Sequence, residues 1–229
     1  MNPTRRDFLL AIGTVAIVFP AANAEEKPDF AKVVLPPKGK DEVHYNFEKW
    51  ADKEGKPLTA EDIKGKLLII YGGYPECAGV CPGAARNLVA AIKKLKKDSP
   101  DLAAKVAVVV VIIRNNEGDT LDKAKARARK WQTEGLEGEK TGIRVLVSDS
   151  QAVLDDFMGK FRIQYKDGEN STLIHSPWAY MFDGKGKMLQ DSNGTYKAGM
   201  IQTQTGSEPI LQKIYEHFGV KNPDPAPSP

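Results

Sequence analysis

Two continuous apolar runs, separated by a segment of helical periodicity, constrain the fold of this chain more than any other feature. Residues 67–71 read LLIIY, and residues 106–113 read VAVVVVII. Between them we expect a helix over residues 82–97, because its apolar residues recur at the spacing of one helix face. Strands that are apolar throughout are buried on both faces, as parallel strands joined by a crossover helix are. The sequence therefore predicts a right-handed βαβ unit.

Further elements are expected on both sides of this unit. They are helices at 121–131, 149–161 and 209–218, a strand at 143–147, a hairpin of 178–182 with 187–190 around the turn 183–186, and a small N-terminal hairpin of 45–50 with 56–58. This order predicts an α/β fold of thioredoxin-like layout. Its three layers contain a central mixed sheet, an inserted β-α element and the extra N-terminal hairpin.

The first 24 residues have the pattern of an export signal. Arg5 and Arg6 precede an apolar stretch that ends near Pro20, and the segment closes on the small residues of Ala22-Asn23-Ala24. The paired arginines resemble the twin-arginine signal. The apolar stretch is shorter than the roughly 20 residues that span a bilayer. We therefore expect cleavage after Ala24, a periplasmic location and no stable membrane span after cleavage.

Composition indicates the bounds of the domain and argues against nucleic acid binding and against a small fold held by disulfides. Residues 25–42 form an expected extended leader, 43–220 the thioredoxin-like domain, and 221–229 a Pro-rich disordered tail. The 229 residues carry a net charge of +3, which gives no general electrostatic case for nucleic acid binding. Two cysteines are too few for a small fold held by several disulfides.

The two cysteines lie together at the expected junction of the first strand and its helix. Cys77 and Cys81 are four residues apart with Gly79 between them, so both sulfurs can converge on one point. Pro82 suits the first position of the helix. Because a helix N-terminus favours an anion, we expect lowered thiol pKa values there. The sequence thus predicts a site of two thiolates, unless the pair forms a structural disulfide.

One of the three histidines is placed to join this site. His175 comes two residues before Pro177, at the mouth of the expected hairpin strand, whereas His44 and His217 are expected to be a surface and a structural residue. Two thiolates suit Cu(I), and an added imidazole suits Cu(II) as well. The residues therefore predict one copper ion per chain, and we expect the Ser176–Pro177 bond to be cis.

Several short motifs together resemble the Sco/SenC family over about residues 45–218. They are the segments 55–59 (GKPLT), 62–66 (DIKGK), 72–74 (GGY), 117–120 (EGDT), the Cys-x-x-x-Cys-Pro motif and His175-Ser176. The resemblance implies an exported thioredoxin-fold protein that binds copper and helps to build the dinuclear copper centre of cytochrome c oxidase. It also implies that the ligands are Cys77, Cys81 and His175. Ala78-Gly79 and Asn115-Asn116 stand where family members usually carry acidic residues.

Three functions remain open for this site. The first is a metallochaperone, not an enzyme in the usual sense, whose partner is a copper enzyme such as an oxidase subunit. The second is a periplasmic thiol-disulfide oxidoreductase that uses the Cys77/Cys81 pair and is itself served by a thiol reductant. The third is a non-catalytic interaction module with a structural disulfide.

Overall fold

The computed structural model divides the chain into the units Met1–Lys32 and Val33–Pro229, and all described residues lie in the second. Described are residues 49–52, 54–74, 80–113, 121–133, 143–148, 150–160, 165–167, 173–175, 178–185, 187–190, 192 and 199–223. The expected signal segment, the leader and most of the tail lie outside these residues. Their boundaries stay predictions.

The βαβ unit is present as predicted. Strand β1 (Leu67–Gly73) pairs in parallel with β2 (Val106–Ile112) along its whole length, and helix α2 (Val80–Asp98) joins them. Every residue of β1 is buried, as are the last five of β2. The apolar runs therefore form the middle of the domain.

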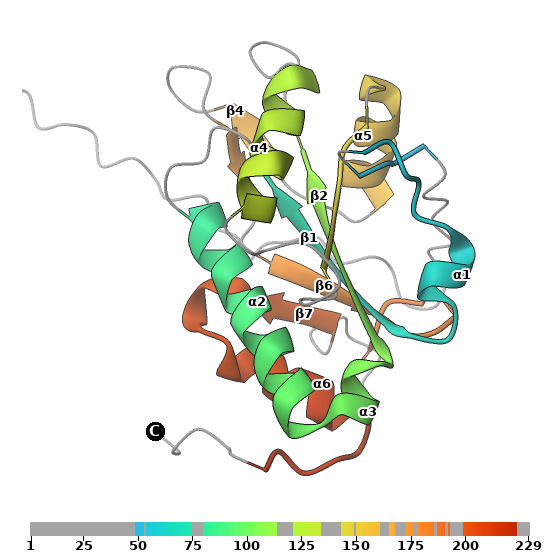
Figure 1. Ribbon diagram of the computed structural model, residues 1–229, viewed down its shortest axis with the longest axis vertical. Helices are drawn as coiled ribbons and strands as arrows, with labels where there is room; N and C mark the ends of the chain where they lie inside the picture. Colours follow the sequence, from blue (N-terminus) through green and yellow to red (C-terminus); the bar gives the residue numbers. More distant parts are fainter. Residues whose placement is uncertain are drawn as a thin grey trace, which may run out of the picture. The chain divides into compact units, whose positions relative to one another are not determined.

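A five-stranded mixed sheet is built around this pair (Figure 1). Its order is β3-β2-β1-β6-β7, with β3 at Ile143–Leu146, β6 at Trp178–Phe182 and β7 at Met200–Gln202. β3 is parallel to β2, whereas β6 is antiparallel to β1 and to β7. This arrangement confirms the expected mixed sheet and the inserted strand at its edge.

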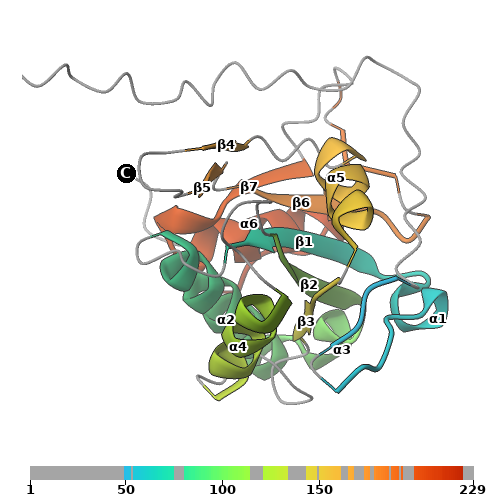
Figure 2. The same ribbon diagram turned by 90° about the horizontal axis from the view of Figure 1, so that it is seen from above.

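Helices cover the sheet on both sides. α4 (Leu121–Thr133) lies on the same side of β1 and β2 as α2, and α5 (Gln151–Lys160) lies on the other (Figure 2). α6 (Glu208–His217) packs against α2. These helices agree with the predicted ones to within a few residues at each end, and they give the three expected layers.

Two segments that follow the hairpin turn pair with β6. Met188 forms a bridge to Phe182, and Leu189 donates its N–H to the Met181 carbonyl, but the strand that pairs with the first half of β6 is β7. A Cβ on Gly199 would lie 2.7 Å from the Leu189 carbonyl oxygen, so the two segments touch. The expected hairpin of 178–182 with 187–190 is therefore confirmed by the pairing of residues 187–189 with 181–183, and β7 is a further strand that pairs with the first half of β6.

Several short elements were not predicted. They are α1 (Ala60–Ile63), α3 (Pro100–Ala103), the 3-10 turn η4 (Thr203–Thr205), and a second sheet of β4 (Tyr165–Asp167) with β5 (Leu173–His175). Segments of three or four residues are too short for a periodic pattern to reveal. The second sheet matters most, because its strand β5 ends at His175.

The N-terminal hairpin is confirmed for residues 50–58, and its first residues, 45–48, lie outside the described chain. Asp52 donates its N–H to the Lys56 carbonyl, and Gly55 occupies the turn with a φ of +82°, a conformation that glycine adopts without strain. Trp50 is fully buried against Phe157 of α5, with ring centroids 5.2 Å apart. The hairpin is therefore part of the core.

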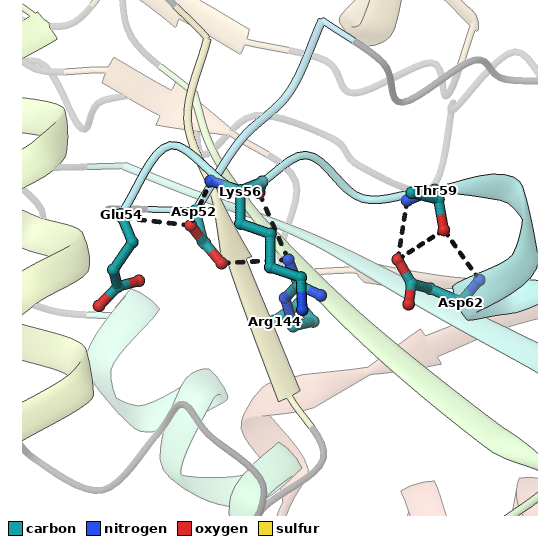
Figure 3. Close-up of polar contacts among 6 residues, drawn as sticks. All are labelled: Asp52, Glu54, Lys56, Thr59, Asp62 and Arg144. Carbon is teal, nitrogen blue, oxygen red and sulfur yellow. Dashed lines mark hydrogen bonds and ion pairs between the residues drawn. The ribbon is translucent and has the colours of Figure 1, made fainter.

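Asp52 fastens this hairpin to the edge strand β3 (Figure 3). Its Oδ1 accepts hydrogen bonds from the N–H groups of Glu54 and Lys56, and its Oδ2 lies 3.1 Å from Nη2 of Arg144. Ala51 exchanges two backbone hydrogen bonds with Val147, directly after β3. These contacts cover part of an edge that would otherwise offer open backbone groups to other chains.

We expect the substitution Asp52→Ala to lower the free energy of unfolding by about 2 kcal/mol, because it leaves two backbone donors and a half-buried guanidinium without their acceptor. Urea unfolding measures the change. Asp155→Ala is the matched control, since within the described residues Asp155 accepts an exposed hydrogen bond from the Gln151 side chain and no other. Equal losses in the two variants would show that the Asp52 contacts contribute nothing special.

The short helix α1 starts with a capping box. The Asp62 carboxylate accepts from the N–H and the hydroxyl of Thr59, and the Asp62 N–H donates to the Thr59 hydroxyl. The hydrogen bond from the Thr59 backbone lowers the pKa of Asp62 most; its hydroxyl and the charges of Arg144 and Lys56 add to the effect, against an opposing contribution from burial. The ionised form is thus the one that the fold stabilises.

A pH-dependent stability follows from this lowered pKa. The contribution of Asp62 is fully present above its unfolded value of 3.8 and is lost as the pH falls through the lower folded value. The stability difference between the parent and Asp62→Asn should therefore be constant near neutral pH and shrink in strong acid. Thermal unfolding of both proteins across the acid range measures it, and a difference that does not change with pH would contradict the assignment.

Candidate functional site

The junction of β1 and α2 buries Cys81 at a helix start. α2 begins at Val80, so Cys81 is its second residue, and its side chain is fully buried. The first N–H groups of a helix have no acceptor within the helix and favour an anion such as a thiolate. The position is the predicted one, although Cys81 lies inside the helix and not in the loop before it. Cys77 lies outside the described residues.

Pro82 is the third residue of α2 and not the first, as the sequence analysis expected. The helix starts two residues earlier, at Val80. A proline is tolerated in the first turn because the N–H group that it lacks would have no partner in the helix. Its side chain is half-buried beside Cys81. Pro82 thus remains at the site, and only the expected start of the helix was wrong.

His175 is the last residue of β5, where its backbone pairs with Tyr165 of β4. It therefore belongs to the second sheet and not to the mouth of the hairpin strand itself. Figure 2 shows β4 and β5 beside each other, outside the five-stranded sheet. Pro177 and the Ser176–Pro177 bond lie outside the described residues, so the cis bond stays a prediction.

Strand pairing brings the backbone of His175 toward the end of β1. Ala179 pairs with Tyr71, and β6 runs antiparallel to β1, so the chain before Ala179 leaves the sheet at the carboxyl end of β1. Four residues span at most about 14 Å. The backbone of His175 therefore lies within about 14 Å of Ala179. Ala179 lies toward the end of the sheet where β1 ends and the chain continues to Cys81.

Asn87 fixes α2 against the segment that follows β7. Its Nδ2 donates a 2.8 Å hydrogen bond to the carbonyl of Thr203, which is fully buried in η4. Asn87 lies less than two turns after Cys81 on the same helix. The hydrogen bond therefore helps to hold the helix start in place, a role that the sequence analysis did not detect because the two residues are 116 positions apart.

Trp178 is another residue near the site that had no signal in the sequence. Its indole Nε1 is buried and has no hydrogen-bond acceptor within the described part of the chain. The residue starts β6, three positions after His175. A buried donor at this edge of the sheet adds a polar group to the surroundings of the site.

A cavity of about 810 Å³ lies at the opposite end of the strands, where β2 begins. Its wall includes the start of β2, part of α3 and the N-terminal hairpin, with Asp52, Asp62 and Arg144 among its polar residues (Figure 3). Both carboxylates accept hydrogen bonds from the protein itself. We therefore assign these polar groups to the attachment of the hairpin and not to the cysteine site.

Among the described helices, none combines the length and apolarity needed to cross a membrane.

Comparison with known proteins decides the family. A family model described as SCO1/SenC matches residues 36–207. The chain belongs to the SCO1/SenC family. The match begins before the described residues and covers all five strands of the sheet.

The relatives of this SCO1/SenC protein are distant in sequence. It is 25% identical over 147 residues to an SCO2-like protein of Rickettsia conorii, and this match covers 61% of the present chain and 64% of the relative. The matched part therefore spans less than two thirds of that relative.

Solved structures show the same fold. Arabidopsis thaliana ScoI with copper bound has a TM-score of 0.55 at 17% identity, with 74% of this chain and 94% of that chain covered. Yeast Sco1 with copper bound also has a TM-score of 0.55 at 17% identity, with 76% and 87% covered. At these identities the likeness shows the fold, and it confirms the predicted α/β class.

The burial of Cys81 leads to a prediction about its reactivity. In a Cys77→Ser variant, we expect Cys81 to react with iodoacetamide at least about tenfold more slowly in the native protein than in denaturant, because a thiolate without solvent access cannot reach the reagent that it must attack. Mass spectrometry of timed samples measures the two rates. Similar rates in both conditions would contradict the buried position.

Proposed function

We propose that this SCO1/SenC protein is an exported copper-binding metallochaperone that delivers copper to the dinuclear copper centre of a respiratory oxidase or a related copper enzyme. The proposed ligands are Cys77, Cys81 and His175, which hold one ion as Cu(I) or Cu(II). Copper is cargo here: it is bound, carried and passed to a client. Membership of the family and the copper-bound structures of two distant relatives support this proposal.

The observation that carries the proposal is the convergence of two chain segments at one edge of the sheet. α2 starts after β1 with Cys81 in its first turn, and the antiparallel pairing of β6 with β1 returns the chain that follows His175 to the same edge. Two segments almost a hundred positions apart in sequence are thus directed to the same end of the sheet. A ligand set for a single ion requires such a convergence.

The donor set suits the chemistry of transfer. Two thiolates favour Cu(I), and an imidazole nitrogen extends the site to Cu(II). A helix N-terminus stabilises the negative charge of the empty thiolate site. A site with few ligands at the end of a strand allows a client to replace those ligands one at a time.

Thiol-disulfide exchange is the second candidate function, and the position of Cys81 at a helix N-terminus favours it as well. In that reaction one thiolate attacks a client disulfide, and the second thiol then displaces the client. Two electrons pass from the cysteine pair to the client, and a thiol reductant restores the pair. Preparing the cysteines of a copper enzyme in this way is compatible with copper delivery.

Export is also part of the proposal. The segment around Arg5 and Arg6 supports a twin-arginine signal that is cleaved after Ala24 and directs the protein to the periplasm. In an oxidising compartment, the cysteine pair exists either as a thiol pair with copper or as a disulfide.

Replacing His175 separates the two chemical functions. In His175→Ala the thiolates remain, so Cu(I) should still bind but more weakly, whereas Cu(II) should bind at least about tenfold more weakly because it depends more on the nitrogen ligand. Anaerobic titration of the reduced protein with Cu(I), and a parallel titration with Cu(II), measure both affinities. Disulfide exchange by the same variant should be nearly unchanged.

Two controls make this result specific. His217→Ala removes a histidine in the last turn of α6 and should bind both copper ions like the parent. Cys81→Ser should lose copper binding and disulfide exchange together. If His175→Ala binds both ions as tightly as the parent, the three-ligand site is wrong and the exchange function is the better assignment.

A further inference from the structure

Helices α2 and α4 carry far more positive charge than the rest of the protein. Together they contain ten Lys and Arg residues and only two acidic residues, Asp98 and Asp122. Their net charge is +8, whereas that of the whole chain is +3, so the remainder is net negative. The basic surface is defined here by Arg86, Lys93, Lys94, Lys96 and Lys97 of α2 and Lys123, Lys125, Arg127, Arg129 and Lys130 of α4.

On α2 the exposed cations form a stripe. Arg86, Lys93 and Lys97 are all exposed, and their spacing of seven and four residues places them on one helix face. The opposite face is buried, with Leu88 and Leu95 fully inaccessible. The stripe therefore points away from the core along most of the helix.

On α4 the inner side is made of small residues and the outer side of cations. Ala124 and Ala128 are fully buried, whereas Lys123, Arg129 and Lys130 are exposed. The ion pair within α2 between Lys94 and Asp98, at 2.9 Å, uses one of only two carboxylates on these helices. A net positive charge concentrated on two neighbouring helices creates a local field that attracts oppositely charged partners.

The basic surface borders the cysteine site. Figures 1 and 2 place α2 and α4 on the same side of the sheet, and α2 starts after the carboxyl end of β1. Cys81 lies at that start, and Arg86 follows five residues later. A partner that contacts the basic surface is thus held next to the residues that we propose to bind copper.

The chemistry of this surface fits an acidic protein better than a membrane. Helices that bind in a membrane interface combine their cations with exposed Trp, Phe or Leu side chains that enter the lipid. Within the described part of the chain, the only exposed large hydrophobic residue is Val220, which lies beyond α6. A cationic surface with no exposed large apolar residue among its described side chains is suited to fast, salt-sensitive docking between proteins.

We propose that the basic surface docks an acidic face of the client protein and so orients it toward the cysteine site. This inference rests on the proposed function for the client's identity, but the docking itself requires no copper. Long-range attraction raises the rate of encounter, and the contact adds little to the lifetime of the complex. Such a complex forms and separates quickly, as repeated delivery requires.

The test uses two variants with equal net charge. The surface variant carries Arg86→Glu, Lys93→Glu, Lys97→Glu and Arg129→Glu. The control variant reverses four exposed lysines outside the two helices, Lys105→Glu, Lys185→Glu, Lys187→Glu and Lys221→Glu. Circular dichroism and thermal unfolding establish that both are folded. The probe is the soluble copper domain of a cytochrome c oxidase subunit II with net negative charge.

Stopped-flow measurement at low salt should give an association rate constant at least about tenfold lower for the surface variant, and a value within about twofold of the parent for the control. The rate constant of the parent should fall steeply as salt is added. Equal slowing of both variants, no slowing of either, or a parent that does not associate with the domain would each overturn the proposal. Binding of the parent to phosphatidylglycerol vesicles through these residues, without docking to the domain, would assign the surface to lipid instead.

Measurements of copper loading and copper transfer separate the docking from the proposed function. Copper loading of the parent and of the surface variant should be the same, because none of the four residues is a proposed ligand. If the parent docks in a salt-dependent manner but binds no copper, the metallochaperone function fails and the docking surface stands. If both proteins take up copper and transfer it to the domain at the same rate, the docking surface is wrong and the function stands.

Discussion

The parallel pairing of β1 with β2 is the constraint on which the rest of the structure depends. Seven residue pairs, from Leu67 opposite Val106 to Gly73 opposite Ile112, fix the register of the two strands. Parallel strands need a crossover connection, so the pairing also decides that α2 lies across the sheet and starts at the carboxyl end of β1. The position of Cys81 follows from that start. The pairing of β6 with β1 fixes the register of β6. Because His175 precedes β6 by three residues, this register also brings its backbone toward the carboxyl end of β1. The candidate site is thus a consequence of one strand pair.

Much of this fold could be predicted from the sequence, because its central elements have strong patterns. The runs at 67–71 and 106–113 were each found within two residues of the observed strands, and the long helices were found with similar accuracy. The failures have a common physical reason. β4, β5 and β7 are three residues long, and their pairing depends on partners distant in sequence and not on local alternation. The hairpin after β6 was predicted correctly from its turn, whereas β7, which also pairs with β6, has no local signal.

The site was predictable in residue types and only partly in position. Cys81 stands at the junction where a strand end meets a helix start, and this position follows from local pattern alone. Assigning His175 to a strand mouth came from its distance to the hairpin, and the second sheet that holds it had no sequence signal. The hydrogen bond from Asn87 to Thr203 and the contact of Asp52 with Arg144 join residues about a hundred positions apart. Such contacts become visible only when the chain is folded, since neither partner has an unusual local sequence.

The close approach of Leu189 and Gly199 has a consequence for how this sheet can change. Leu189, which follows the hairpin, and Gly199, which precedes β7, lie against each other, so the two ends of the connecting segment are close together. Closing a longer loop between fixed ends costs only about 0.6 kcal/mol for each doubling of its length. The pairing of β6 with β7 therefore does not depend on how many residues are inserted. This point is a natural place for sequences of different length to accumulate among relatives, and for a peptide or a small domain to be inserted without moving β1, β6 or β7.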